Sequence, residues 1–291
     1  MKWAQLIRIN NLLFVGLTHV LFRCSLFPFL NLETKITDAY FTVLSLSILG
    51  VTASGNIIND IYDVQTDKLN NRDRPLALGK ISTKGAWIAY AIAVVGSLAL
   101  AFVFCLKYHL WWLLLAEVLT IFLLFLYAWR LKQIAVWGNI LISSLVSLSF
   151  MLLIFVELPL ELNSIHIHWI VFFGGFAFWT NLNREIIKDV QDIKGDYSCH
   201  YNTLPIAIGR SRTQSVLFVS TSLLVIAISV GIKNYLFAPV DILIYFIFVV
   251  CLPLGFVAYR LFRQEQLVNY KHLSLMYKSV MLAGVLSLVF L

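Results

Sequence analysis

The sequence has little charge. Asp, Glu, Lys and Arg make up only 13% of its 291 residues, whereas a soluble domain carries about 25%. Hydrophobic residues make up 60% of the chain. So few charged side chains cannot cover the surface of a protein of this size in water. The composition therefore excludes an ordinary soluble protein and predicts that lipid surrounds most of the chain.

Cysteine is scarce as well. The four cysteines lie far apart, without the close spacing of a zinc site or the density of a disulfide-stabilised fold. Three of them fall in apolar stretches, where a buried thiol packs like a small hydrophobic side chain. The sequence therefore predicts neither a zinc site nor a disulfide framework.

Long apolar runs are abundant instead. A helix that crosses a membrane needs about 20 predominantly apolar residues. Nine runs approach this length: 11–30, 39–58, 85–105, 110–129, 134–156, 167–183, 213–232, 238–260 and 272–291. We therefore expect an all-α integral membrane protein in which one domain, residues 1–291, forms a bundle of nine transmembrane helices. Two connections, 59–84 and 184–212, are long, polar and rich in aspartate, and we expect them to be loops.

The basic residues predict the orientation of the chain. If the N-terminus is cytoplasmic, most of the 22 Lys and Arg residues lie on the cytoplasmic side, together with both long connections. Only Lys35, Lys107 and Lys233 fall on the opposite side, which is typical of the positive-inside rule. This asymmetry accounts for the net charge of +7 without nucleic acid, and it favours membrane lipids and diphosphates as ligands. Nothing in the sequence calls for an obligate protein partner.

The two polar connections resemble each other. Each contains the pattern D-x-x-D-x-x-x-D, followed by P-x-A-x-G and a basic residue. The first copy starts at Asp60 and Pro75, and the second starts at Asp189 and Pro205. Two matches in the same order favour an internal duplication, with halves of roughly 1–133 and 134–291.

Each connection carries a set of acidic and amide side chains at helical spacing. The sets are Asn59, Asp60, Asp63 and Asp67, and Glu185, Asp189, Asp192 and Asp196. Carboxylates one turn apart on a helix repel each other, and acids near lipid are costly. Mg²⁺ is the best candidate to offset this charge, because it binds through one or two carboxylates together with phosphate oxygens. We expect basic residues beside the sets to contact the remaining phosphate oxygens: Arg72, Arg74, Lys132 and Lys188.

These motifs resemble those of the UbiA family of intramembrane prenyltransferases. Asn59-Asp60-x-x-Asp63-x-x-x-Asp67 with Arg72-Asp-Arg74-Pro75 is similar to the first family signature, and Asp189-x-x-Asp192-x-x-x-Asp196 is similar to the second. Tyr127 and Lys132, before Gly138-Asn139, resemble a third family element. Many members have an Arg-Pro pair near the first span, where this chain has Arg8-Ile9, so the resemblance does not extend a phosphate-binding role to Arg8.

The resemblance implies a Mg²⁺-dependent prenyltransferase in a bacterial or archaeal cell membrane, with an isoprenoid diphosphate as donor. It implies metal ligands at Asn59, Asp63, Asp67, Asp189, Asp192 and Asp196. It implies catalytic roles for Asp60, Asp63, Asp189 and Asp192. It implies diphosphate contacts from Arg72, Arg74, Lys132, Lys188 and Tyr127.

The acceptor is open at this point. Residues 184–205 are similar to the digeranylgeranylglyceryl-phosphate synthase branch, whose members attach a prenyl chain to a glycerol hydroxyl of a phosphorylated lipid. Members that prenylate aromatic acceptors, such as quinone precursors, share the metal motifs. A cation-coupled transporter is an alternative from another class, because intramembrane acids and repeats also suit ion translocation.

Two ionisable residues fall inside predicted spans, Arg23 and Glu117. Such residues are functional candidates by default, because a charge in lipid is costly. Arg23 either reaches the diphosphate, extends its charged group to the membrane surface or pairs with Glu117.

Overall fold

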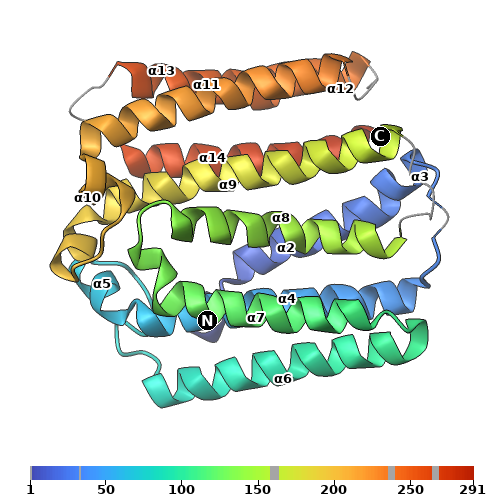
Figure 1. Ribbon diagram of the computed structural model, residues 1–291, viewed down its shortest axis with the longest axis horizontal. Coiled ribbons are helices and arrows are strands. Elements are labelled where there is room, and N and C mark those ends of the chain that lie inside the picture. The colour runs from blue at the N-terminus through green and yellow to red at the C-terminus, as the bar shows by residue number, and fades with distance from the viewer. Residues whose placement is uncertain (1, 33, 158–163, 235–239, 264–268) are drawn as a thin grey trace.

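Helices account for almost all of the computed structural model, which describes residues 2–32, 34–157, 164–234, 240–263 and 269–291. Within these residues there is no strand, only an isolated β-bridge between Ile134 and Asn202. The long helices lie side by side with their axes along one common direction (Figure 1).

The helices up to residue 133 are as follows: α1 (Lys2–Leu6), α2 (Ile9–Leu21), continued by η1 (Phe22–Leu26) and α3 (Phe27–Phe29), α4 (Asp38–Tyr62), α5 (Val64–Leu69), α6 (Thr83–Tyr108), α7 (Trp111–Trp129) and η2 (Leu131–Gln133). The later helices are α8 (Trp137–Glu157), α9 (Ser164–Ser198), α10 (Leu204–Ile208), α11 (Arg210–Asn234), α12 (Val240–Tyr245), continued by η3 (Phe246–Cys251) and α13 (Leu252–Phe262), α14 (Tyr270–Leu286) and η4 (Ser287–Phe290).

The apolar stretches form an integral membrane bundle. Eight helical stretches among the described residues are long and apolar enough to cross a membrane: 9–29, 38–62, 83–108, 111–129, 137–157, 210–232, 240–262 and 270–290. Large apolar side chains cover their outer faces, and Ile92, Val95 and Leu115 are each at least 67% exposed. Lipid is the solvent that tolerates such a surface. The ninth expected span, 167–183, lies within α9, and the count of nine stays a prediction.

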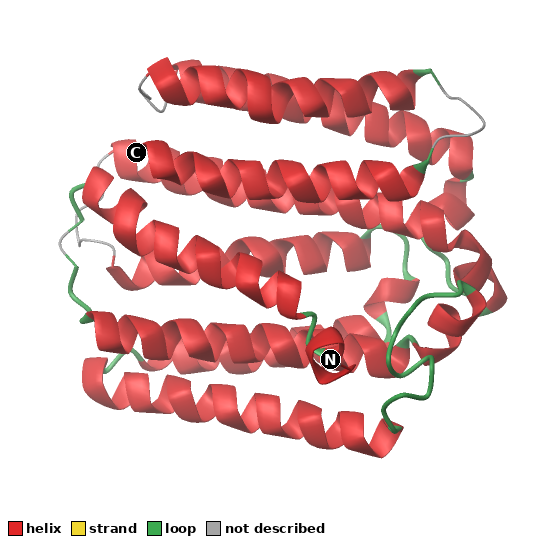
Figure 2. Ribbon diagram, turned by 180° about the vertical axis from the view of Figure 1, so that it is seen from behind, coloured by secondary structure: helices red, strands yellow, loops and turns green. Residues whose placement is uncertain are grey.

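The order of packing brings α2 and α8 to the centre of the bundle. α4 packs against α6 and α7 on one side, while α9 packs against α8, α11 and α14 on the other (Figure 1). Seen from behind, many of the connecting loops gather at one end (Figure 2). The short helices α5 and α10 lie at that same end, which we call the polar end.

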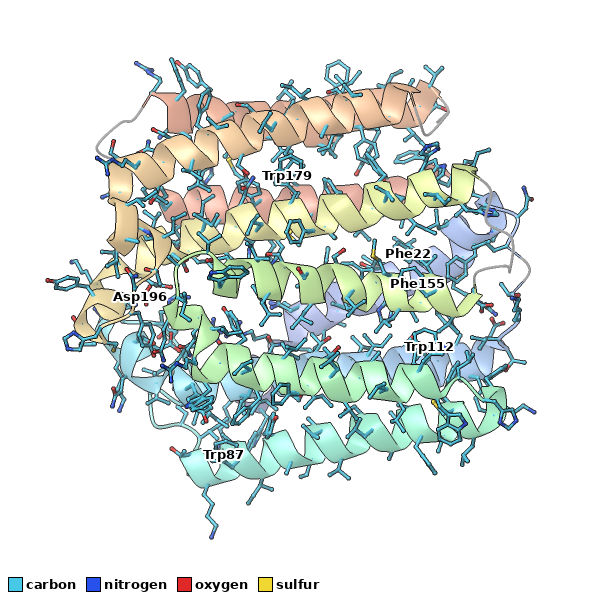
Figure 3. The ribbon with its side chains drawn as sticks, in the orientation of Figure 1. Phe22, Trp87, Trp112, Phe155, Trp179 and Asp196 are labelled. Atoms are coloured by element: carbon cyan, nitrogen blue, oxygen red, sulfur yellow. The ribbon has the colours of Figure 1, made fainter. Side chains whose placement is uncertain are left out.

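The aspartate motifs are more helical than the sequence predicts. Asp60 is still on α4, Asp67 is on α5, and α9 continues without a break through Asp196 to Ser198. Much of each predicted loop is therefore helix, in which the backbone groups are satisfied by local hydrogen bonds. Asp196 lies at the polar end, whereas Trp112 lies toward the opposite end (Figure 3).

Arg23 has partners other than those expected. Its guanidinium donates to Asp38 at 2.8 Å, to Glu157 at 2.7 Å and to the carbonyl of Ile36 at 2.6 Å. Glu117 instead accepts a hydrogen bond from Ser47 at 2.7 Å. The prediction that Arg23 reaches the diphosphate or pairs with Glu117 is therefore wrong, because the start of α4 and the end of α8 bring two acids to Arg23.

Candidate active site

A cavity of about 290 Å³ extends from the polar end into the bundle. Helices α2, α4, α7, α8, α9 and α14 all contribute to its lining. The predicted site residues that line it are Asn59, Asp63, Asp67, Arg72, Arg74, Tyr127, Lys132, Lys188, Asp189, Asp192 and Asp196. The fold thus brings the two distant motifs to one place.

Direct contacts join the two motifs. Arg72 donates to Oδ1 of Asp192 from Nε at 3.0 Å and from Nη2 at 2.6 Å. The backbone N–H of Gly195 donates to Oδ1 of Asn70 at 2.9 Å. A Cβ atom on Gly195 would lie 2.4 Å from Nδ2 of Asn70, so only glycine permits α5 to approach α9 this closely. The absence of a side chain at this position therefore sets the distance between the motifs.

Lys132 is held at the cavity by a close turn between α7 and α8. Its ammonium forms an ion pair with Asp63. A Cβ atom on Gly138 would lie 2.8 Å from Cα of Lys132, so glycine is required here as well. The next residue, Asn139, donates to Oδ2 of Asp189 at 2.9 Å. The Gly-Asn pair therefore orients one basic and one acidic residue of the site.

The two aspartate motifs bring five carboxylates to the cavity, from Asp63, Asp67, Asp189, Asp192 and Asp196. Basic side chains line it as well, among them Arg72, Arg74, Lys132 and Lys188. Burial raises the pKa of Asp67 to about 6, and the charge of Asp63 adds to the rise. Burial raises the pKa of Asp196 to about 7, with Asp192 and Asp63 adding to it. These carboxyl groups thus resist full ionisation unless a cation joins them.

The donor set suits Mg²⁺. Carboxylate and amide oxygens are the ligands of a hard cation, and Oδ1 of Asn59 is buried without a hydrogen-bond partner among the described residues. Within the same residues, no three acidic, histidine or cysteine side chains converge as ready-made ligands of one ion. This fits an ion that binds through one or two carboxylates and takes its remaining ligands from water and phosphate.

Asp60 and Arg8 form a pair beside the site. Oδ1 of Asp60 accepts a hydrogen bond from Nη2 of Arg8 at 2.6 Å, and its side chain is fully buried. Asp60 is not among the residues that line the cavity, whereas Arg8 is. This placement argues against the catalytic role predicted for Asp60, because its carboxylate holds Arg8 instead. Arg8, which the missing Arg-Pro pair had left without a role, does face the cavity.

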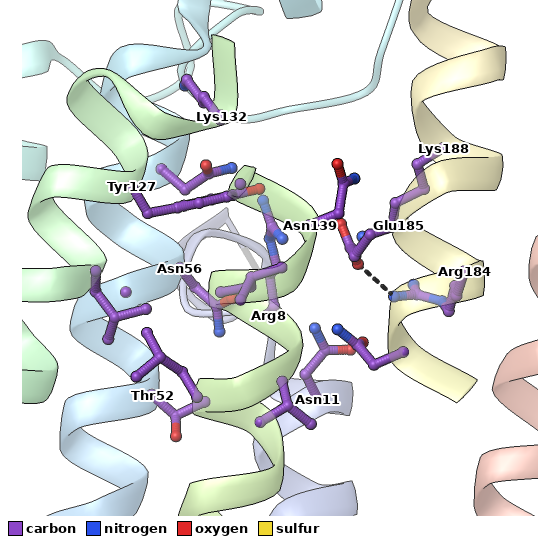
Figure 4. A pocket seen from close by; sticks show the side chains of 18 of the residues that line it. Arg8, Asn11, Thr52, Asn56, Tyr127, Lys132, Asn139, Arg184, Glu185 and Lys188 are labelled. Atoms are coloured by element: carbon purple, nitrogen blue, oxygen red, sulfur yellow. Dashed lines mark hydrogen bonds and ion pairs between the residues drawn. The ribbon is translucent and has the colours of Figure 1, made fainter. Parts of the chain in front are cut away.

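The sequence predicted no site role for several polar residues of the opposite wall. Arg184 and Glu185 on α9 face Arg8, Tyr127 and Asn139 across the cavity (Figure 4). Arg184 begins the stretch 184–205 that resembles one branch of the family, whereas Lys278 belongs to no motif and its only signal was basic charge in an apolar helix. Such residues can be assigned to the site only when the packing of the neighbouring helices is known.

Away from the polar end, the cavity becomes apolar. Ile48, Val51 and Leu124 line this part, together with Glu117. Glu117 lies ten residues before Tyr127 on α7, which is about 15 Å along the helix axis. The cavity thus joins an acidic mouth to a deep, largely apolar interior.

Comparison with known proteins identifies the family. Residues 21–282 match the UbiA prenyltransferase family. The chain belongs to this family. It is 34% identical over 222 residues to the digeranylgeranylglyceryl phosphate synthases of Thermococcus kodakarensis and Thermococcus gammatolerans, which covers 73% of either chain in each comparison. The family resemblance of the motifs is thereby confirmed, and the chain is a prenyltransferase rather than a transporter.

Solved structures share the fold. A UbiA homolog from Aeropyrum pernix K1 superimposes with a TM-score of 0.71 at 15% identity, covering 100% of this chain and 99% of that one. A UbiA homolog from Archaeoglobus fulgidus, bound to DMAPP and Mg²⁺, has a TM-score of 0.64 at 19% identity and covers 100% of both chains.

Proposed function

We propose that this protein transfers a prenyl group from an isoprenoid diphosphate to a hydroxyl of a glycerol phosphate lipid, with Mg²⁺. The observation that carries the proposal is the division of the cavity into an acidic mouth and an apolar interior. The mouth suits a metal-bound diphosphate and the interior suits the prenyl chain. The acceptor class is supported by the relatives at 34% identity, which are digeranylgeranylglyceryl phosphate synthases.

Mg²⁺ would be held by oxygen atoms of the two motifs, with one or two carboxylates for each ion and the remaining ligands from water and phosphate. The candidate ligands are Asn59, Asp63, Asp67, Asp189, Asp192 and Asp196. Bound there, Mg²⁺ would supply positive charge to the departing diphosphate. Arg72, Arg74, Lys132 and Lys188 line the same part of the cavity and would contact phosphate oxygens, with the Tyr127 hydroxyl close by.

The reaction exchanges one carbon–oxygen bond for another. The bond between C1 of the allylic group and the diphosphate oxygen breaks, and its electron pair leaves with the diphosphate. The hydroxyl oxygen of the acceptor forms the new bond to C1, and the released diphosphate takes up the hydroxyl proton. The apolar lining, including Leu124 and Leu145, keeps water from the allylic carbon so that the acceptor captures it.

The orientation belongs to the same proposal. The N-terminus and the polar end would face the cytoplasm of a bacterial or archaeal cell, with the rest of the chain in the membrane. The concentration of Lys and Arg on that side supports this orientation.

A transfer assay tests the proposal. Purified protein receives Mg²⁺ and labelled geranylgeranyl diphosphate, with a geranylgeranylglycerol phosphate lipid, dihydroxynaphthoate, hydroxybenzoate and homogentisate as parallel acceptors. We expect Mg²⁺-dependent label in the glycerol phosphate lipid alone. Label in one of the aromatic acceptors alone would overturn the proposed acceptor class and leave prenyl transfer standing.

A further inference from the structure

Two basic residues outside the aspartate patterns also line the cavity. They are Arg184 on α9 and Lys278 on α14, and Lys188 lies between Arg184 and Asp189 on α9. A single carboxylate, Glu185, accepts from Arg184 at 3.2 Å and from Lys188 at 2.5 Å (Figure 4). Arg184 and Lys188 thus share one carboxylate, and Lys278 brings a further positive charge to the same cavity. An anion in the cavity would balance this excess.

Lys278 is half-buried and lines the same cavity as Arg184. Nε of Arg184 is buried and has no hydrogen-bond partner among the described residues. A buried donor without a partner is costly, which is a sign of a ligand that completes the site.

The packing of α9 on α14 brings Arg184 and Lys278 together. Asn183 donates from Nδ2 to the hydroxyl of Tyr277 at 3.2 Å, and that hydroxyl also bonds to Thr221 at 2.5 Å. This buried bond ties the two helices together immediately before Arg184 and Lys278 in the chain. Arg184 and Lys278 directly follow these two hydrogen-bonded residues, and both line the same cavity.

This pair is separate from the metal site. Asp189 and Asp192 follow Arg184 on α9 by five and eight residues, which corresponds to about 8 and 12 Å along the helix axis. One phosphate group is too small to contact both places. Lys188, one turn beyond Arg184, lies between the pair and the metal site.

A separate apolar surface continues from this pair. Met281, one turn beyond Lys278, lines the cavity with Phe14 and Phe150. The same three residues line a small adjoining apolar cavity with Phe22 and Phe173. This surface runs along α2, α8, α9 and α14, whereas Ile48, Val51 and Leu124 lie on α4 and α7. The bundle therefore offers two apolar surfaces, each leading from its own group of charged side chains.

We propose that Arg184 and Lys278 bind the phosphate of the acceptor lipid, whose hydrocarbon tail lies along Met281, Phe14 and Phe150. The inference rests on the proposed function, because it requires an acceptor that carries both a phosphate monoester and an apolar chain. It assigns the donor and the acceptor to different anion sites in one cavity, so that the two negatively charged substrates bind without displacing each other.

The test compares the Michaelis constants of the two substrates in Arg184→Gln and Lys278→Gln. Each variant should raise the KM of the phosphorylated acceptor at least about tenfold, the scale of one lost charge-assisted hydrogen bond. The KM of geranylgeranyl diphosphate should stay at the wild-type value. The preference for the phosphorylated lipid over the same lipid as its free alcohol should fall in both variants, and Lys278→Arg should restore it. Lys271→Gln is the matched control, because it removes an exposed lysine of α14 that does not line the cavity.

The possible outcomes separate the two proposals. If the wild-type protein uses the phosphorylated lipid and the variants keep its KM and its preference over the alcohol, the anion site alone is refuted. Equal increases in both Michaelis constants also refute it, since they indicate general damage to the cavity. If the wild-type protein transfers label only to aromatic acceptors, the proposed function fails, and the acceptor site fails with it.

Discussion

The contact at Gly195 offers a sharp test of how the two motifs cooperate. In Gly195→Ala, the new Cβ atom would lie 2.4 Å from Nδ2 of Asn70 and 2.9 Å from the carbonyl oxygen of Thr66. Atoms in proteins do not approach this closely, so something must move. Asn70 can rotate, but the carbonyl of Thr66 is backbone, and only a shift of α5 away from α9 relieves that contact.

The cost has several parts. Forcing extra volume into a packed contact costs about 1–3 kcal/mol. Loss of the hydrogen bond from Gly195 to Asn70 costs about 0.5–1.5 kcal/mol more, while alanine regains about 1 kcal/mol of helix propensity. The free energy of unfolding should therefore fall by about 1–3 kcal/mol. Catalysis should suffer more, because a shift of about 1 Å in a reacting site lowers the rate by up to about 10²-fold.

The assay is steady-state prenyl transfer at several Mg²⁺ concentrations, with thermal unfolding measured in parallel. We expect a lower kcat/KM for the diphosphate and a higher Mg²⁺ requirement, because Arg72 and Asp67 shift relative to Asp192. Gly175→Ala is the matched control on the same helix, since its Cβ atom would meet nothing within 4 Å. A wild-type kcat/KM in Gly195→Ala, or an equal loss in Gly175→Ala, would refute the reasoning.

Three further predictions follow from other contacts. Arg23→Gln leaves the fully buried carboxylate of Glu157 without its basic partner, so the free energy of unfolding should fall by about 3–5 kcal/mol. The activity of the folded fraction should stay unchanged, and a wild-type melting temperature would contradict the prediction. Asn139→Leu removes the donor that orients Asp189, and the affinity for Mg²⁺ in titrations of activity should fall about 10- to 100-fold, with excess Mg²⁺ restoring turnover. Removal of divalent ions with EDTA should abolish transfer and added Mg²⁺ should restore it, whereas turnover that persists in EDTA would exclude the metal site.

The comparison of Asp60 with Asp63 shows how far a motif can be interpreted from sequence. Both belong to the same aspartate pattern, and their spacing alone does not separate them. Asp63 lines the cavity beside Lys132, whereas Asp60 points to Arg8 and is buried outside it. The difference depends on the position of Arg8, between α1 and α2, relative to Asp60. The sequence of α4 alone does not determine that position.

The sequence by itself determined the membrane class, the helical architecture and the two acidic motifs. These follow from composition and from spacing along single helices, which are local properties of the chain. Only the tertiary structure decided that Arg72 meets Asp192, that Arg23 meets Glu157 and that Asn183 meets Tyr277. Those pairs join residues far apart in the sequence, and they depend on how helices pack, which no single segment of the chain encodes.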